Sequence, residues 1–247
     1  MGIPAGWRQG DQTRGWSGDR PLLAAGSSRS ARVELACTTS AAGDLRVDGP
    51  PAELDARRRA VLDGSWTWLR QVHGCEVVTV TRPGEGAGST ADGAVSAAPG
   101  AVLAVTVADC APVAFWSPQG VVGVAHAGWR GLLGGVLERT VDAMARLGAT
   151  EVSALVGPCI GASCYEFGPA ELASASDRLG AGVAGVTAWG TPALDVVACV
   201  RAVLAPLGIG VDDALWRCTA CASDLWSWRA RGDRSRQALA LALRGAP

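Results

Sequence analysis

Residues 102–131 read VLAVTVADCAPVAFWSPQGVVGVAHAGWRG, and the pattern in this stretch decides the fold class. Two apolar runs are typical of buried strands; the first ends at Asp109-Cys110 and the second at His126, with a short turn expected between them. A glycine-flanked Trp129-Arg130 then leads into an amphipathic segment typical of a helix. Each predicted strand therefore delivers one metal-competent side chain at its C-terminal end.

Strand-like and helix-like segments are mixed along the rest of the chain. The apolar spacing predicts strands at 33–38, 66–72, 76–81, 101–107, 121–125, 152–156 and 237–243, and helices at 52–62, 131–147, 170–179 and 195–204. Composition does not break after residue 31 and no internal repeat is present, which predicts a single layered α/β domain over residues 32–247. Residues 1–31 are rich in Gly, Ser and Arg without a hydrophobic period, and we expect a disordered extension there.

Composition excludes several classes of function. The net charge is −1 and the longest run of like charge is Arg57 to Arg59, so we expect no nucleic-acid partner. No apolar run approaches the roughly 18 residues of a membrane span or forms a signal peptide, so we expect a cytoplasmic monomer with no membrane partner. All 22 basic residues are arginine, which excludes Schiff-base and P-loop lysine chemistry.

The candidate metal ligands are the only two histidines, His73 and His126, together with Cys110. Neutral imidazole and thiolate are the usual ligands of zinc and copper, and three protein ligands leave the open position typical of catalytic zinc. The alternative is that both histidines are ordinary turn residues and Cys110 is a small buried apolar residue. Gly74 and Gly128 lie beside the histidines and permit sharp backbone bends where a side chain faces a cleft.

Three further residues are candidates for catalysis. Arg130 stands just before a predicted helix and suits an anionic or phosphate-bearing substrate, with an ordinary surface arginine as the alternative. Asp92 and Asp109 suit acid–base roles or hydrogen bonds to a ligand imidazole, with simple turn residues as the alternative.

The remaining cysteine pairs carry weaker signals. Cys159 and Cys164 admit a second thiol site, but we interpret them as buried structural cysteines. Cys218 and Cys221 have CxxC spacing without a second pair, which is a weak indication of metal binding or redox chemistry.

Five segments resemble a known family when they are taken together. QVHG (71–74), ADG (91–93), ADCAPV (108–113), HAGWRG (126–131) and GPCIGASCYEFG (157–168) occur in the order seen in YfiH-type proteins. These are the laccase-domain or multicopper polyphenol oxidase family, also described as purine nucleoside phosphorylases. The resemblance covers about residues 32–244.

This resemblance implies a single-domain sandwich with mixed sheets and a zinc ion held by His73, Cys110 and His126, with copper binding by substitution. It implies purine nucleosides and phosphate as partners. The reactions would be phosphorolysis of adenosine, inosine, guanosine or methylthioadenosine and deamination of adenosine. In such reactions Arg130 would hold phosphate, and Asp92 or Asp109 would manage protons.

Other relatives are described as copper laccases or as a peptidoglycan editing factor, and a purely binding role is a further alternative. Two histidines cannot build the trinuclear cluster of a multicopper oxidase. The chain also departs from the family pattern: Ser40 stands where an arginine is usual, Arg58-Arg59 replace Asn-Arg, and Ser235 replaces a glycine before Arg236. The missing arginine puts the choice of substrate in question.

Overall fold

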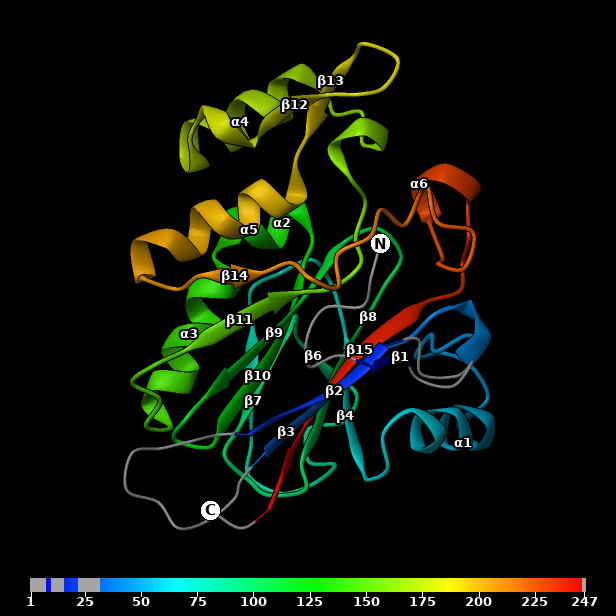
Figure 1. Cartoon of the computed structure of the whole chain (residues 1–247), viewed down its shortest axis with the longest axis vertical. Coiled ribbons are helices and arrows are strands. Elements are labelled where there is room, and N and C mark those ends of the chain that lie inside the picture. Colours follow the sequence, from blue (N-terminus) through cyan, green and yellow to red (C-terminus); the bar gives the residue numbers. More distant parts are fainter. Residues whose placement is uncertain (1–7, 10–15, 22–31, 246–247) are drawn as a thin grey trace.

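The computed structural model describes residues 8–9, 16–21 and 32–245, which form two large sheets and several helices (Figure 1). The first sheet has the order β1 (Arg8–Gln9), β2 (Trp16–Pro21), β3 (Arg32–Cys37), β15 (Gln237–Arg244), β8 (Val102–Val107), β4 (Trp66–Arg70) and β6 (Ser89–Thr90). The second has the order β14 (Val211–Asp212), β11 (Ser153–Val156), β9 (Ala111–Ser117), β10 (Val121–Ala127), β7 (Gly93–Ser96) and β5 (Val77–Val80). A two-stranded sheet joins β12 (Ala184–Val186) to β13 (Pro192–Leu194). The predicted layered α/β fold with mixed sheets is confirmed.

Three of the helices, α1 (Pro51–Val61), α3 (Val136–Arg146) and α5 (Val196–Leu204), pack on the outer faces of the two sheets. The other described helices are α2 (Trp129–Gly134), α4 (Pro169–Leu179) and α6 (Trp228–Arg231). Apolar residues of α3 and α5 share one buried cluster with the second sheet, whereas the end of α1 packs on the first sheet. A third cluster lies between the sheets, so the molecule has the layer order helix, sheet, sheet, helix.

The last strand, β15, shows how the sequence builds these layers. Its residues 237–244 read QALALALR, and successive side chains of a strand point to opposite faces. The leucines at 239, 241 and 243 pack between the sheets, and the alanines at 238, 240 and 242 pack beneath α1. Because both faces are covered, the strand is apolar along almost its whole length.

Two local expectations were wrong. The short turn expected after Cys110 is β9, which pairs with β10 from Ala111↔Ala127 to Ser117↔Val121. The helix expected over 131–147 is divided into α2 and α3 at Gly135, whose φ of 91° is left-handed and cannot continue a right-handed helix.

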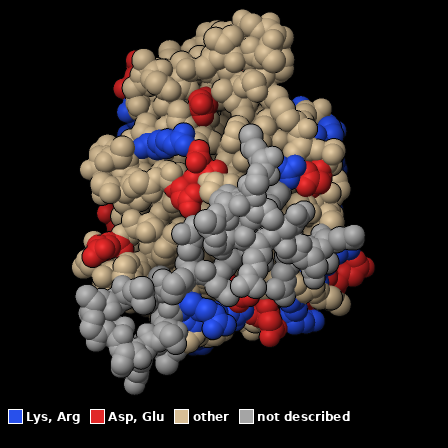
Figure 2. Space-filling model, viewed as in Figure 1, with Lys and Arg blue, Asp and Glu red and all other residues tan. Residues whose placement is uncertain are grey.

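The N-terminal segment is described in part. Residues 16–21 pair antiparallel with β3, so this piece of the expected disordered extension is a strand of the first sheet. The remaining residues of that prediction, 1–7, 10–15 and 22–31, lie outside the described part of the chain. On the described surface seen in Figure 2, arginine and acidic side chains are interspersed rather than separated by sign. No helix in the described ranges has the length and apolarity to span a membrane.

Candidate active site

The structure brings the three predicted metal ligands together at the ends of strands. His73 follows β4, Cys110 lies between β8 and β9, and His126 lies near the end of β10. Nε2 of His73 is 3.7 Å from Sγ of Cys110, and the two imidazole rings have centroids 4.8 Å apart at 74°. One ligand atom from each residue lies within 4.8 Å of the other two.

Asp92 holds both histidine segments with one carboxylate. Its side chain is fully buried at the start of β7, and Nδ1 of His126 lies 2.7 Å from its Oδ1. The same carboxylate accepts hydrogen bonds from the backbone amides of Val72, His73 and Gly74 at 3.2, 2.9 and 2.8 Å. These amides stabilise the loop in which His73 has a positive φ of 58°. This is the position of a hydrogen-bond partner for a ligand imidazole, one of the two roles expected for Asp92.

Asp109 is a second buried anchor. Its φ is 94°, an uncommon value for a residue with a side chain, and it directly precedes Cys110. Its carboxylate accepts hydrogen bonds from the hydroxyls of Thr219 and Ser227 at 2.6 Å each and from the Arg229 amide at 2.7 Å. These contacts tie the end of β8 to the segment around α6. No local pattern indicates the roles of Thr219 and Ser227, because they are 110 and 118 residues away from Asp109 in the chain.

Position 128 requires a glycine because neighbouring side chains lie close to its Cα, not because the backbone bends there. A Cβ atom at this position would lie 2.7 Å from Cδ2 of His73 and 3.2 Å from Sγ of Cys110. Gly128 has an ordinary φ of −71°, so the conformation itself suits any residue. The glycine leaves space for two of the three candidate ligands.

The charges of Cys110 and His126 are coupled. Burial acts to raise the pKa of the Cys110 thiol, but the charge and hydrogen bond of His126, together with His73, bring that pKa well below its usual value. Burial acts to lower the pKa of His126, but the Cys110 thiolate and the Asp92 carboxylate raise it. In the metal-free site each group therefore favours the charged form of the other, and the thiolate that this favours is the form that binds metal ions.

A cavity of about 300 Å³ opens beside this group. It is lined by three arginines, by three aromatic residues and by members of the ligand group: Arg130, Arg229, Arg236, Trp129, Tyr165, Trp228, His73, Ala108, Asp109 and Cys110. Within the described part of the chain, no acidic side chain forms an ion pair with any of these three arginines. The cavity therefore joins unneutralised positive charge to aromatic surface beside the candidate ligands.

The arginines of this cavity are positioned by local contacts. The guanidinium carbon of Arg130 lies 4.3 Å from the centroid of the Trp129 ring, and that of Arg229 lies 5.1 Å from the Tyr165 ring. Nη1 of Arg236 donates to the backbone carbonyls of residues 233, 234 and 235. Of the three, only Arg130 was predicted. Arg229 and Arg236 lie in the C-terminal segment, and the cluster of arginines there is the one sequence feature that could have indicated their part in the cavity.

A smaller cavity of about 210 Å³ is lined by all three candidate ligands and shares His73, Ala108, Cys110 and Arg236 with the first. Ser40, the departure from the family pattern, lines neither cavity; its amide donates to the Asp224 carbonyl at 2.8 Å in a 3-10 turn. The position that lacks the usual arginine thus lies outside the residues that line the two cavities.

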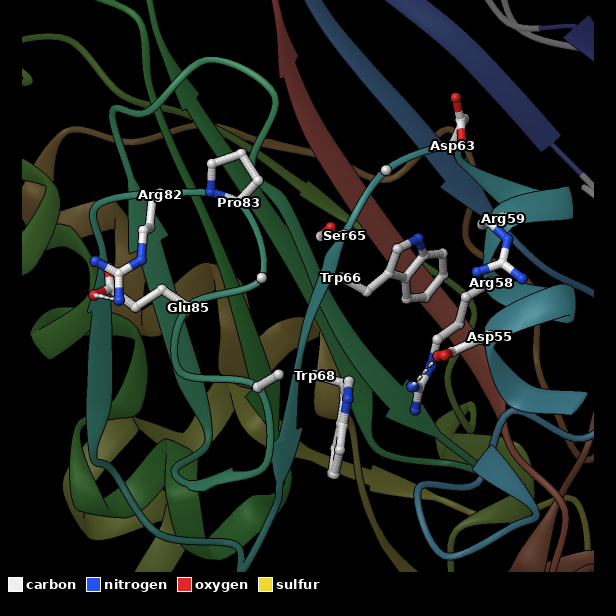
Figure 3. Close-up of a pocket in the computed structure, with 13 residues that line it drawn as sticks. Asp55, Arg58, Arg59, Asp63, Ser65, Trp66, Trp68, Arg82, Pro83 and Glu85 are labelled. Carbon is white, nitrogen blue, oxygen red and sulfur yellow. Dashed lines mark ion pairs between the residues drawn. The ribbon is translucent and has the colours of Figure 1, made fainter. Parts of the chain in front are cut away.

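A larger cavity, about 720 Å³, lies elsewhere in the molecule (Figure 3). It lies between α1, β4 and the loop around Arg82, and it contains none of the predicted site residues. Arg58 is ion-paired with Asp55 at 3.5 Å and Arg82 with Glu85 at 3.6 Å, as the dashed lines in Figure 3 mark. Two of its three arginines are thus neutralised, which makes it the weaker candidate for an anionic substrate.

Comparison with known proteins agrees with this architecture. A family model described as multi-copper polyphenol oxidoreductase laccase matches residues 30–244. The purine nucleoside phosphorylase ORF3 of Streptomyces griseus is 38% identical over 209 residues, covering 83% of this chain and 85% of the relative. A purine nucleoside phosphorylase of Deinococcus radiodurans is 38% identical over 188 residues, covering 73% and 72%.

The fold is also found in solved structures. The crystal structure of the Bacillus licheniformis hypothetical protein YfiH superposes with a TM-score of 0.77 at 22% identity, covering 98% of this chain and 100% of that one. The Neisseria meningitidis protein NMB0706 gives a TM-score of 0.71 at 25% identity, covering 92% and 99%. Because the family model matches nearly the whole described domain, the chain belongs to the multi-copper polyphenol oxidoreductase laccase family.

Proposed function

We propose that this protein is a zinc-dependent purine nucleoside phosphorylase whose metal is held by His73, Cys110 and His126. The observation that carries the proposal is the cavity in which two of the three ligands, His73 and Cys110, lie beside three arginines without acidic partners in the described chain and three aromatic rings. Relatives that share 38% of their residues with this chain are named purine nucleoside phosphorylases.

The donor set fits zinc. Tetrahedral zinc with bonds of about 2.0–2.3 Å separates its ligand atoms by roughly 3.3–3.8 Å, and the 3.7 Å between His73 Nε2 and Cys110 Sγ agrees with this. Asp92 bonded to His126 is the carboxylate partner that ligand histidines usually have. When bound, zinc would supply a Lewis acid at an open fourth position. The same two nitrogens and one sulfur would accept copper by substitution.

The arginines suit phosphate and the rings suit a purine. Guanidinium groups bind phosphate oxygens through paired, charge-assisted hydrogen bonds, and aromatic rings stack on nucleobases. In the proposed reaction a phosphate oxygen held by Arg130 attacks the anomeric carbon of the ribose. The bond from that carbon to the purine nitrogen breaks, and the leaving purine takes the proton that the attacking hydrogen phosphate gives up.

Tyr165 is our candidate to face the leaving purine. Burial and the neighbouring Cys110 thiolate raise the pKa of its phenol to about 12, so it remains a protonated hydrogen-bond donor at neutral pH. Asp92 and Asp109 already accept four and three hydrogen bonds respectively. We therefore assign both aspartates to positioning rather than to proton transfer.

Adenosine, inosine, guanosine and methylthioadenosine are the proposed substrates, with adenosine deamination as a second reaction of the same cavity. The alternative of a laccase-like copper oxidase is disfavoured by the donor count, because two histidines cannot assemble a trinuclear cluster. Hydrolysis of a peptidoglycan precursor at the same site is the remaining alternative.

The deciding experiment is product analysis of zinc-loaded protein incubated with adenosine in the presence and absence of phosphate. Adenine with ribose 1-phosphate, formed only with phosphate, is the expected result; inosine formed without phosphate would establish deamination. Cys110→Ala should abolish turnover. Arg59 is an exposed arginine that lines the separate 720 Å³ cavity, so Arg59→Ala should leave turnover unchanged. No turnover by fully zinc-loaded protein would overturn the proposal.

A further inference from the structure

A second group of thiols comes together outside the site described above. Cys164 ends the 3-10 turn Ala162–Cys164, and Cys218 and Cys221 flank a turn between β14 and α6. The sulfur atoms of all three lie within 4.8 Å of one another, with Cys164 and Cys221 only 3.4 Å apart. The CxxC segment, which has no second pair in the sequence, thus has a third thiol as its partner in the fold.

The spacing of the sulfur atoms is that of ligands around one ion. Tetrahedral zinc with bonds of about 2.3 Å to sulfur separates its thiolates by roughly 3.8 Å, a value inside the range of this cluster. A disulfide requires about 2.05 Å between two sulfur atoms and would leave the third thiol without a role.

The Cys218 sulfur is already held as a ligand would be. The backbone amide of Gly161 donates a hydrogen bond to it at 3.3 Å. The turn itself is closed by the amides of Cys221 and Ala222, which donate to the Cys218 carbonyl at 3.2 and 3.0 Å. Amide donors aimed at a sulfur favour its thiolate form, which is the form that binds a metal ion.

The cysteine cluster is accessible to a metal ion from solvent, and an ion bound there would connect two segments of the chain. Cys221 is exposed and Cys164 and Cys218 are half-buried, so an ion can enter from solvent. Cys164 directly precedes Tyr165, and Cys218 directly precedes Thr219, whose hydroxyl holds Asp109 at 2.6 Å. An ion bound by the three sulfurs would therefore join the segment of Tyr165, which lines the cavity beside Cys110, to the segment of Thr219, which holds Asp109 of the same cavity wall.

We propose that Cys164, Cys218 and Cys221 form a second metal site, separate from the His73, Cys110 and His126 group, that binds a thiophilic d10 cation, Zn²⁺ foremost. Three thiolates without a carboxylate or imidazole are a soft donor set that selects such ions. A solvent molecule completes the coordination at the exposed side.

The test measures metal content in the full-length protein and does not depend on enzymatic activity. After incubation with Zn²⁺ and dialysis, the wild-type protein should hold about two equivalents, and Cys110→Ala and Cys221→Ser about one each. The double variant should hold none, and the control Cys75→Ser, at a thiol outside both groups, should keep both. Circular dichroism confirms that each variant is folded, and Cys164→Ser provides a second removal of the proposed site.

Cadmium makes the two sites distinguishable by spectroscopy. The Cys110→Ala protein loaded with Cd²⁺ should retain ultraviolet thiolate-to-metal charge-transfer absorption, which Cys164→Ser and Cys221→Ser should each remove from that background. The proposal is overturned if Cys110→Ala binds no metal. It is equally overturned if mass spectrometry of unreduced, metal-saturated protein finds Cys164 and Cys221 in a disulfide. Either result leaves the proposed phosphorylase activity to be judged on its own experiment.

Discussion

Oδ1 of Asp92 lies 2.7 Å from Nδ1 of His126, and the same carboxylate binds the amides of the loop that carries His73. One buried side chain thus sets the orientation of one candidate ligand and the backbone of the other. With Nδ1 engaged, Nε2 is the nitrogen of His126 that remains for a metal ion. The two histidines are 53 positions apart in the sequence, and Asp92 is the residue that makes them one site.

We expect Asp92→Asn to weaken metal binding more than it weakens the fold. The amide keeps the shape of the side chain but replaces one acceptor oxygen with a donor nitrogen that conflicts with the backbone amides. Loss of such a partner typically lowers metal affinity roughly 10–100-fold. Competition with a chromogenic chelator measures this change. Asp142→Asn, at an exposed aspartate on α3, is the control and should leave affinity unchanged; equal affinity for both variants would contradict the assigned role.

The Cys110 thiol should titrate below its ordinary pKa in metal-free protein. The positive charge of His126 stabilises the thiolate, so deprotonation occurs at lower pH than for a free thiol with its value near 9.0. Thiolate absorbance at about 240 nm is measured from pH 4 to pH 10 for wild type and for Cys110→Ala. The difference between the two titrations reports Cys110 alone among the eight cysteines. Removing the positive charge in His126→Ala should move the inflection upward. An inflection that stays in place would show that His126 does not act on the thiol.

Gly128→Ala should disturb the ligand group through a single methyl group. The added Cβ would lie 2.7 Å from the His73 ring, so the ring or the backbone has to move. Overpacking of this kind costs about 1–3 kcal/mol, or roughly 5–150-fold in zinc affinity if the cost falls on the metal-bound form. Gly182→Ala is the matched control, because nothing lies within 4 Å of its added Cβ. Isothermal titration with zinc compares the two, and unchanged affinity in Gly128→Ala would refute the close approach.

Apolar runs predicted seven of the fifteen described strands, because buried strands are rich in apolar residues such as Leu103 and Val105. The proximity of His73, Cys110 and His126 was also predictable, since strand ends and glycine-rich loops place side chains at a common edge. β9 was missed because its sequence, APVAFWS, contains a proline in its second position and lacks a clear alternation. Pro112 has no amide to donate to the sheet, but its carbonyl accepts from the Gly157 amide at 2.9 Å.

The roles of the two aspartates could not be derived from sequence. Whether a carboxylate is free to move protons depends on how many donors surround it, and those donors come from distant segments, as Thr219 and Ser227 do for Asp109. The same limit applies to Cys164, which meets Cys221 only because the loop after β11 packs on the segment before α6. Contacts between residues so far apart in the sequence leave no local sequence pattern, so only the folded structure reveals them.

Arg130→Ala should raise the KM for phosphate far more than the KM for the nucleoside. Its guanidinium lines the cavity without an acidic partner in the described chain, so its charge is available to an anion. Loss of a charged hydrogen bond costs about 1.5–3 kcal/mol, or roughly 10–150-fold in kcat/KM for phosphate. Arg130→Lys should recover only part of this loss, because an ammonium group cannot bind two phosphate oxygens in the planar fork of a guanidinium. Initial-rate kinetics with varied phosphate at saturating nucleoside distinguishes the two substrates. An equal rise in both KM values would instead place Arg130 in the general packing of the cavity wall, against the Trp129 ring.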